Sequence, residues 1–158
     1  MTRRVAIAIG SNLGHRDAAL AFASLQLSAI LRNFTISEII ETWPVGEGTD
    51  DQNLYLNAVA VGETELSARQ LLDALLAVEQ AFGRERPVKN AARTLDLDLI
   101  LYGDEIVVDE GLEVPHPRFR ERFFVLGPLA EIAPDMVDPV SGMRVAELLR
   151  ELLRDEDR

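Results

Sequence analysis

The chain has no cysteine, only two histidines and a single tryptophan among its 158 residues. Without cysteine there is no disulfide framework and no thiolate chemistry, which fits a cytoplasmic protein. Proline and glycine, at 7 and 10 residues, are too few for a low-complexity or collagen-like chain. What remains is an ordinary globular composition, whose chemistry we expect to be carried by carboxylates and arginines.

Long apolar runs are also absent. None approaches the roughly 20 residues of a membrane-spanning helix, and the run at 5–9 is too short for a signal-peptide core. Basic charge is scarce, because 16 Lys and Arg face 27 Asp and Glu, a net charge of −11. We therefore expect no membrane and no nucleic acid as partners. The length suits one domain, residues 1–158, with no obligate protein partner implied.

The basic residues that exist are unevenly placed. Arg84, Arg86, Lys89 and Arg93 fall within ten positions that contain one acid, Glu85. One interpretation is a binding site for a small phosphorylated ligand. The alternative is a solvated loop that merely neutralises nearby carboxylates.

Hydrophobic spacing predicts alternating strands and helices. Ser67 and Gln70 form a capping-box pattern at a helix start, and Gly83 is a plausible helix end. The order predicts an α+β, ferredoxin-like βαββαβ sandwich with a C-terminal hairpin and helix extension. The expected strands are 5–9, 34–42, 54–61, the segment after 93 and 106–108, and the expected helices are 16–31, 67–82 and 145–153.

The segment RTLDLDLILYG, residues 93–103, combines a strand pattern with two aspartates. Its leucines at 95, 97, 99 and 101 are predicted to share one face of the strand. Asp96 and Asp98 then share the other face, about 7 Å apart along the strand. Ionised carboxylates beside a core require compensation, so arginines or a divalent metal are expected nearby.

Several motifs together resemble one family, the 6-hydroxymethyl-7,8-dihydropterin pyrophosphokinases of folate biosynthesis. They are IAIGSNLG, YLNA, EQAFGR, ARTLDLDLILYG and VPHPRFRERFFVLGPLAEIAPD, in this order over roughly residues 4–137. The resemblance implies transfer of pyrophosphate from ATP to the pterin hydroxymethyl oxygen, which releases AMP. ATP and the reduced hydroxymethylpterin would be the small-molecule partners.

The resemblance also implies site residues. Asp96 and Asp98 would hold two magnesium ions that bridge the ATP phosphates, as suits a cation that takes few carboxylates. Glu79 would lie behind these ligands or be only a helix-surface acid. The catalytic arginines would be Arg84, Arg86 and Arg93, and the nucleotide would contact Arg84, Arg93, Ile100, His116 and Arg122.

The pterin side of the expected site contains aromatic and amide groups. A flat ring stacks well between aromatic side chains, and an amide matches its polar edge. The resemblance assigns this role to Thr42, Val45, Tyr55, Asn57 and Phe124. In one departure from the family pattern, residues 84–92 contain no aromatic residue.

Two other functions compete with this interpretation. A polymerase-like nucleotidyltransferase also uses Gly-Ser and an Asp-x-Asp pair, but places them close together. Here Ser11 precedes Asp96 by 85 positions, which disfavours that class. A non-catalytic ferredoxin-like binding module would need neither the aspartate pair nor the basic loop.

Overall fold

The computed structural model describes residues 1–12, 16–42, 55–84 and 95–156, while 13–15, 43–54, 85–94 and 157–158 lie outside the described residues. One antiparallel sheet has the order β2-β4-β1-β5, and the short strand β3 also pairs with β4. The strands of this sheet are β1 (Arg3–Ser11), β2 (Arg32–Ile36), β3 (Ile40–Thr42), β4 (Tyr55–Thr64) and β5 (Asp96–Tyr102).

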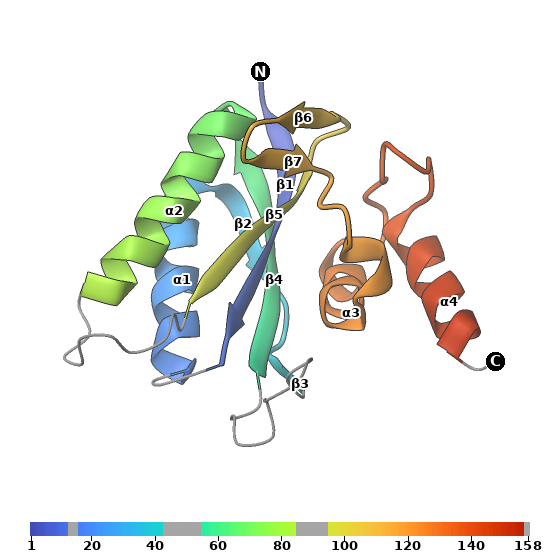
Figure 1. Ribbon diagram of the computed structural model, residues 1–158, viewed down its shortest axis with the longest axis horizontal. Helices are drawn as coiled ribbons and strands as arrows, with labels where there is room; N and C mark the ends of the chain where they lie inside the picture. The colour runs from blue at the N-terminus through green and yellow to red at the C-terminus, as the bar shows by residue number, and fades with distance from the viewer. Residues whose placement is uncertain (13–15, 43–54, 85–94, 157–158) are drawn as a thin grey trace.

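Helices cover both faces of the sheet (Figure 1). Helices α1 (Arg16–Ile30) and α2 (Ala68–Arg84) pack on one face, and α3 (Phe123–Ile132) packs on the other, with α4 (Val145–Glu156) outside it. Strand alternation supplies two cores, because Ile7 and Ile9 face α1 and α2 while Ala6 faces α3. The expected α+β class is confirmed at this level, as an antiparallel sheet with four α-helices.

The predicted capping box at the start of α2 is present. The Gln70 amide donates to Ser67 Oγ at 3.1 Å, and the Ser67 amide donates to Gln70 Oε1 at 2.9 Å. These reciprocal bonds satisfy two backbone donors near the helix start. The predicted end at Gly83 is wrong, because α2 continues through Gly83 to Arg84.

The predicted strand 34–42 is interrupted. Ile36 pairs with Ala60 and Ile40 with Asn57, so this side has one residue more than β4 between the two pairs. Ser37 fills the break, because its Oγ accepts the Val59 amide at 2.9 Å. A serine hydroxyl can take over a backbone acceptor in this way, so the strand splits into β2 and β3.

A second irregularity in the sheet lies in β5. Its pairing with β1 shifts between Ala6, which faces Leu101, and Ile7, which faces Leu99. Beyond this bulge Leu101 packs in the α3 core, together with Ile100. The prediction that Leu101 shares a face with the preceding leucines is therefore wrong, because the extra residue reverses the alternation.

The C-terminal third adds a hairpin and helices. Strands β6 (Val107–Asp109) and β7 (Leu112–Val114) form a two-stranded hairpin, and the 3-10 helix η1 (Phe119–Glu121) leads directly into α3. The predicted helix 145–153 is present as α4 and continues to Glu156. None of the helices in the described residues is long and apolar enough to cross a membrane.

Candidate active site

One end of the sheet face on the α3 side carries small residues in its centre. In β1, Gly10 pairs with Asn57 of β4 on one side and with Asp96 of β5 on the other. Ala8 pairs in the same way with Asp98. Directly paired residues share a face, so Asp96 and Asn57 stand about 10 Å apart, two strand spacings, on either side of Gly10. Asp98 lies on the same face beside Ala8.

The aspartate pair lies at the beginning of β5, as its first and third residues. Asp98 is exposed and Asp96 is half-buried, whereas the alternating Leu97 and Leu99 are buried. Among the residues that the structure describes, no group of three or more acidic, histidine or cysteine side chains could hold a metal ion. A pair of carboxylates on one strand face suits magnesium, which takes most of its ligands from phosphate oxygens and water.

Glu79 of α2 contacts the strand between these two aspartates. Its Oε2 accepts the Leu97 backbone amide at 2.6 Å. Since β5 is the edge strand of the sheet, this amide points away from β1 and would otherwise face solvent. The contact fixes the backbone from which Asp96 and Asp98 project, and it is consistent with the predicted supporting role of Glu79.

The residues expected on the pterin side meet at the ends of β3 and β4. Asn57 is 6% exposed, and its Nδ2 donates to Thr42 Oγ1 at 2.7 Å. Tyr55 pairs directly with Thr42 in the strand register and is partly buried. The Thr42 bond orients the Asn57 amide and leaves its carbonyl oxygen and second N–H for a ligand. Val45 lies outside the described residues.

The first turn of α3 carries Phe124 and begins after Arg122. Phe124 is half-buried against the second core, and the Arg122 guanidinium lies over its ring at 5.6 Å. Helix α3 contacts both β3 and β4. Arg122 and Phe124 therefore lie on the same side of the sheet as Asn57. The roles predicted for them, nucleotide contact for Arg122 and pterin contact for Phe124 and Asn57, stay predictions.

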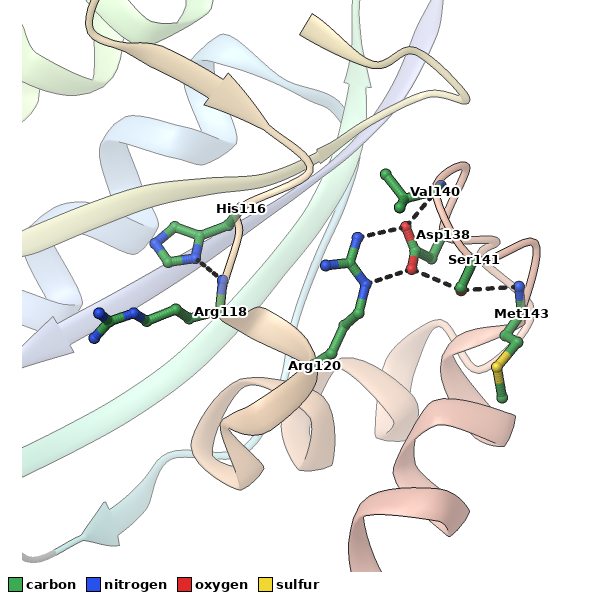
Figure 2. A network of polar contacts seen from close by, with 7 residues as sticks. All are labelled: His116, Arg118, Arg120, Asp138, Val140, Ser141 and Met143. Atoms are coloured by element: carbon green, nitrogen blue, oxygen red, sulfur yellow. Dashed lines mark hydrogen bonds and ion pairs between the residues drawn. The ribbon is translucent and has the colours of Figure 1, made fainter. Parts of the chain in front are cut away.

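His116 is held by two backbone bonds. Its amide donates to the Ile100 carbonyl at 3.0 Å, and its ring Nδ1 accepts the Arg118 amide at 3.2 Å (Figure 2). Burial lowers the pKa of His116 below its ordinary value, and the Asp98 carboxylate opposes this shift. A neutral ring with Nδ1 as acceptor carries its proton on Nε2, so His116 presents a hydrogen-bond donor there.

A pocket of about 370 Å³ opens beside β5, and His116 and Asp98 are among its lining residues. Its apolar wall includes Leu72, Leu97 and Leu99. Ile100, one of the residues expected to contact the nucleotide, buries its side chain in the α3 core, and its carbonyl accepts the His116 amide. Its nucleotide contact stays a prediction. The sequence did not identify Leu72 and Leu99 as pocket residues, because a leucine that lines a pocket has the same spacing as a leucine in a core.

The arginines predicted to be catalytic lie wholly or partly outside the described residues. Arg84 ends α2, but its side chain is outside the description, and Arg86 and Arg93 lie in the segment 85–94, which is outside it entirely. Their roles stay predictions. The described side chains still bring the two aspartates, His116 and the pterin-side residues to one end of the molecule.

Comparison with known proteins indicates the same family as the sequence motifs. The family model of 7,8-dihydro-6-hydroxymethylpterin-pyrophosphokinase (HPPK) matches residues 6–134. A 2-amino-4-hydroxy-6-hydroxymethyldihydropteridine pyrophosphokinase of Methylorubrum extorquens is 41% identical over 151 residues, which cover 94% of this chain and 93% of the relative. The Haemophilus influenzae protein of the same name is 42% identical over 92% of this chain and 90% of its own length.

Longer relatives contain the same region. A Synechocystis pyrophosphokinase is 50% identical over 98 residues, 62% of this chain and 50% of that protein. The wild-type Plasmodium falciparum HPPK-DHPS structure matches with a TM-score of 0.75 at 11% identity, over 98% of this chain and 45% of the other. At that identity the structural match shows the fold alone. Motifs, family model and full-length relatives agree, and the chain belongs to the 7,8-dihydro-6-hydroxymethylpterin-pyrophosphokinase family.

Proposed function

We propose that this chain transfers the pyrophosphoryl group of ATP to the hydroxymethyl oxygen of 6-hydroxymethyl-7,8-dihydropterin, the activity of the family to which it belongs. The observation that carries the proposal is the sheet face described above. Asp96 and Asp98 stand on β5 and Asn57 stands on β4, with Gly10 of β1 between Asp96 and Asn57 and Ala8 of β1 beside Asp98. These two small residues leave room above β1 for a flat acceptor and a phosphate chain to meet.

On the β5 side, the chain would bind ATP. The apolar wall of Leu72 and Leu99 suits a nucleobase. His116 Nε2–H suits a phosphate oxygen as a neutral donor. Two magnesium ions would be held by Asp96 and Asp98, and such ions neutralise the charge that develops on the transferred phosphates.

On the β4 side, the chain would bind the pterin. Asn57 offers a carbonyl acceptor and an N–H donor to the amide-like edge of the ring, while its other N–H is occupied by Thr42. Tyr55 and Phe124 supply aromatic surface, and Val45 would complete the wall. The residues orient the acceptor oxygen toward the phosphates, which is the main protein contribution expected for phosphoryl transfer.

The basic segment would complete the site from outside the described residues. Arg84, Arg86 and Arg93 carry planar guanidinium groups that suit bidentate phosphate contacts. We propose that they neutralise the phosphate chain opposite the aspartates. Arg122, which lies over Phe124, would extend the positive charge toward the acceptor.

The domain organisation, the compartment and the partners of this reaction are proposed as well. We propose that residues 1–158 act as one ferredoxin-like domain. The antiparallel strand order β2-β4-β1-β5 supports this proposal, as does the position of α1 and α2 in the chain, after β1 and after β4. The chain would act in the cytoplasm, consistent with its lack of cysteine. The small-molecule substrates would be its only required partners.

The product of ATP distinguishes the proposal from its competitors. The purified chain is incubated with ATP, magnesium and the reduced hydroxymethylpterin, and the nucleotide products are separated by chromatography. We expect AMP and the pterin diphosphate in equal amounts. Release of inorganic pyrophosphate with a nucleotidylated acceptor would instead indicate a nucleotidyltransferase, and ligand binding without turnover would indicate a binding module.

A further inference from the structure

A fully buried carboxylate lies between α3 and α4. Asp138 is 0% exposed. Its two oxygens accept hydrogen bonds from Arg120 Nε at 2.5 Å, Arg120 Nη2 at 2.9 Å, Ser141 Oγ at 2.7 Å and the Val140 amide at 3.0 Å (Figure 2). The Arg120 guanidinium also lies 4.7 Å from the centre of the Phe119 ring. Because both carboxylate oxygens accept several hydrogen bonds, the side chains of Asp138 and Arg120 have closely defined positions.

This ion pair joins the two ends of α3. Arg120 belongs to η1, immediately before the helix, and Asp138 follows the helix, 18 residues later. The turn that contains Asp138 is itself fixed, because the Asp138 amide donates to the Met143 carbonyl at 2.9 Å and the Gly142 amide donates to the Asp138 carbonyl at 2.8 Å. Arg120 is therefore attached to a rigid support at the start of α4.

The beginning of α3 lacks a side-chain cap. Its N-cap residue is Arg122, which makes no side-chain capping bond, and its first turn contains no acid. Local capping therefore contributes little to the direction in which the helix starts. That first turn carries Phe124, and Arg122 lies over the Phe124 ring.

We propose that Arg120 and Asp138 are positioning residues for the pterin pocket. The pair sets the start of α3 and thereby the places of Phe124 and Arg122, and this step rests on the pterin role proposed above. His116 has its own anchor, because its amide is bonded to the Ile100 carbonyl of β5. Since Arg122 is also expected to contact the nucleotide, loss of the pair should affect pterin binding most and nucleotide binding to a smaller degree.

The experiment compares three variants of the full chain. Arg120→Lys keeps the charge but loses the planar fork, and Asp138→Asn keeps the shape but loses the charge. We expect each to raise the pterin KM on the order of tenfold, as displaced substrate-binding groups do, with a clearly smaller rise in the KM for ATP. The matched control is Asp135→Asn, whose partner is Arg4 at 3.1 Å in an exposed ion pair. It should change neither constant.

Amide hydrogen exchange of the ligand-free protein tests the pair without reference to activity. We expect faster exchange in residues 125–130 of Arg120→Lys and unchanged exchange in β1 and β4. Equal rises in both KM values, an unchanged pterin KM, or global unfolding of both variants would each overturn the proposal and leave the pair a general stability element. Failure of the wild type to use or bind the pterin would contradict the proposed function instead, while the exchange result would remain interpretable.

Discussion

The two faces of the central sheet are built from the same strands but filled differently. On one face, Ile7 and Ile9 are at most 1% exposed beneath α1 and α2. On the other face, Ala8 and Gly10 of the same strand are partly exposed, because α3 covers only part of it. The difference shows how a site arises within a regular sheet. Small residues on alternate positions leave space on one face while the branched residues between them keep the other face packed.

The largest effect should come from the aspartates on the open face. Asp98→Asn should lower the rate of pyrophosphoryl transfer by about 100- to 1000-fold, because a charge that anchors the phosphates is lost. Since Asp98 is exposed, the melting temperature should stay the same or rise slightly as carboxylate repulsion is relieved. Near-full activity at ordinary magnesium concentration would exclude Asp98 from the metal site.

The buried ion pair between η1 and the segment before α4 should respond oppositely. Asp138→Asn should lower the free energy of unfolding by about 3 kcal/mol near neutral pH, since removing one charge of a buried pair leaves the other without compensation. The pKa of Asp138 determines how this loss of stability depends on pH. Burial acts to raise its pKa, but hydrogen bonds from Arg120, Ser141 and the Val140 amide outweigh that effect and hold the pKa below its ordinary value.

A carboxyl group with a lowered folded pKa stabilises the protein above its unfolded pKa, about 3.9. That contribution is lost as the pH falls below this value and through the lowered folded pKa. The stability difference between wild type and Asp138→Asn should therefore be constant between about pH 5 and 7 and shrink below about pH 4. Urea unfolding across this range measures it, and a difference that does not change with pH would contradict the assignment.

Exchanging side-chain size on adjacent residues of β1 tests the comparison directly. A Cβ at Gly10 would lie 3.4 Å from Asn57 Oδ1. Gly10→Ala should therefore be tolerated, while Gly10→Val should weaken pterin binding about tenfold by crowding the space above β1. Ile9→Val, on the packed face, should cost about 1 kcal/mol of stability and leave pterin binding unchanged. Calorimetry with pterin and thermal unfolding measure the two effects, and weakening by both substitutions would erase the distinction.

The smallest effect concerns the capping box of α2, far from the proposed site. Ser67→Ala removes the acceptor of the Gln70 amide and should cost about 1 kcal/mol of stability. Activity at 25 °C should not change, because this helix end is remote from Asp98. Ser67→Asp, which can also cap the helix, should restore the stability. Loss of activity in a folded Ser67→Ala protein would mean that the packed face contributes directly to the site.

Sequence reasoning found the features that local patterns determine. The alternation of β1, the Ser67–Gln70 box and the shared face of Asp96 and Asp98 each depend on neighbouring positions, and all three are present. It missed the break at Ser37 and the reversal at Leu101, because a single extra residue in a strand leaves no trace in hydrophobic spacing.

The sequence also did not predict the contacts that support the site, because they join residues far apart in the chain. The Glu79 bond to the Leu97 amide joins residues 18 positions apart, and the Arg120–Asp138 bond spans the same separation. Their existence depends on how α2 and α3 cross the sheet. The family motifs indicated Glu79 without a definite role, and nothing in the sequence singled out Asp138.

The edge of β5 has a consequence for behaviour at high protein concentration. An edge strand with the sequence DLDLILY is a template for pairing with another molecule and hence for aggregation. Here the Leu97 amide is bonded to Glu79, and the Ile100 carbonyl is bonded to the His116 amide. An incoming strand would have to displace both bonds and approach the exposed charge of Asp98. The groups proposed to prepare this strand for ATP thus also keep one molecule from joining its sheet to the next.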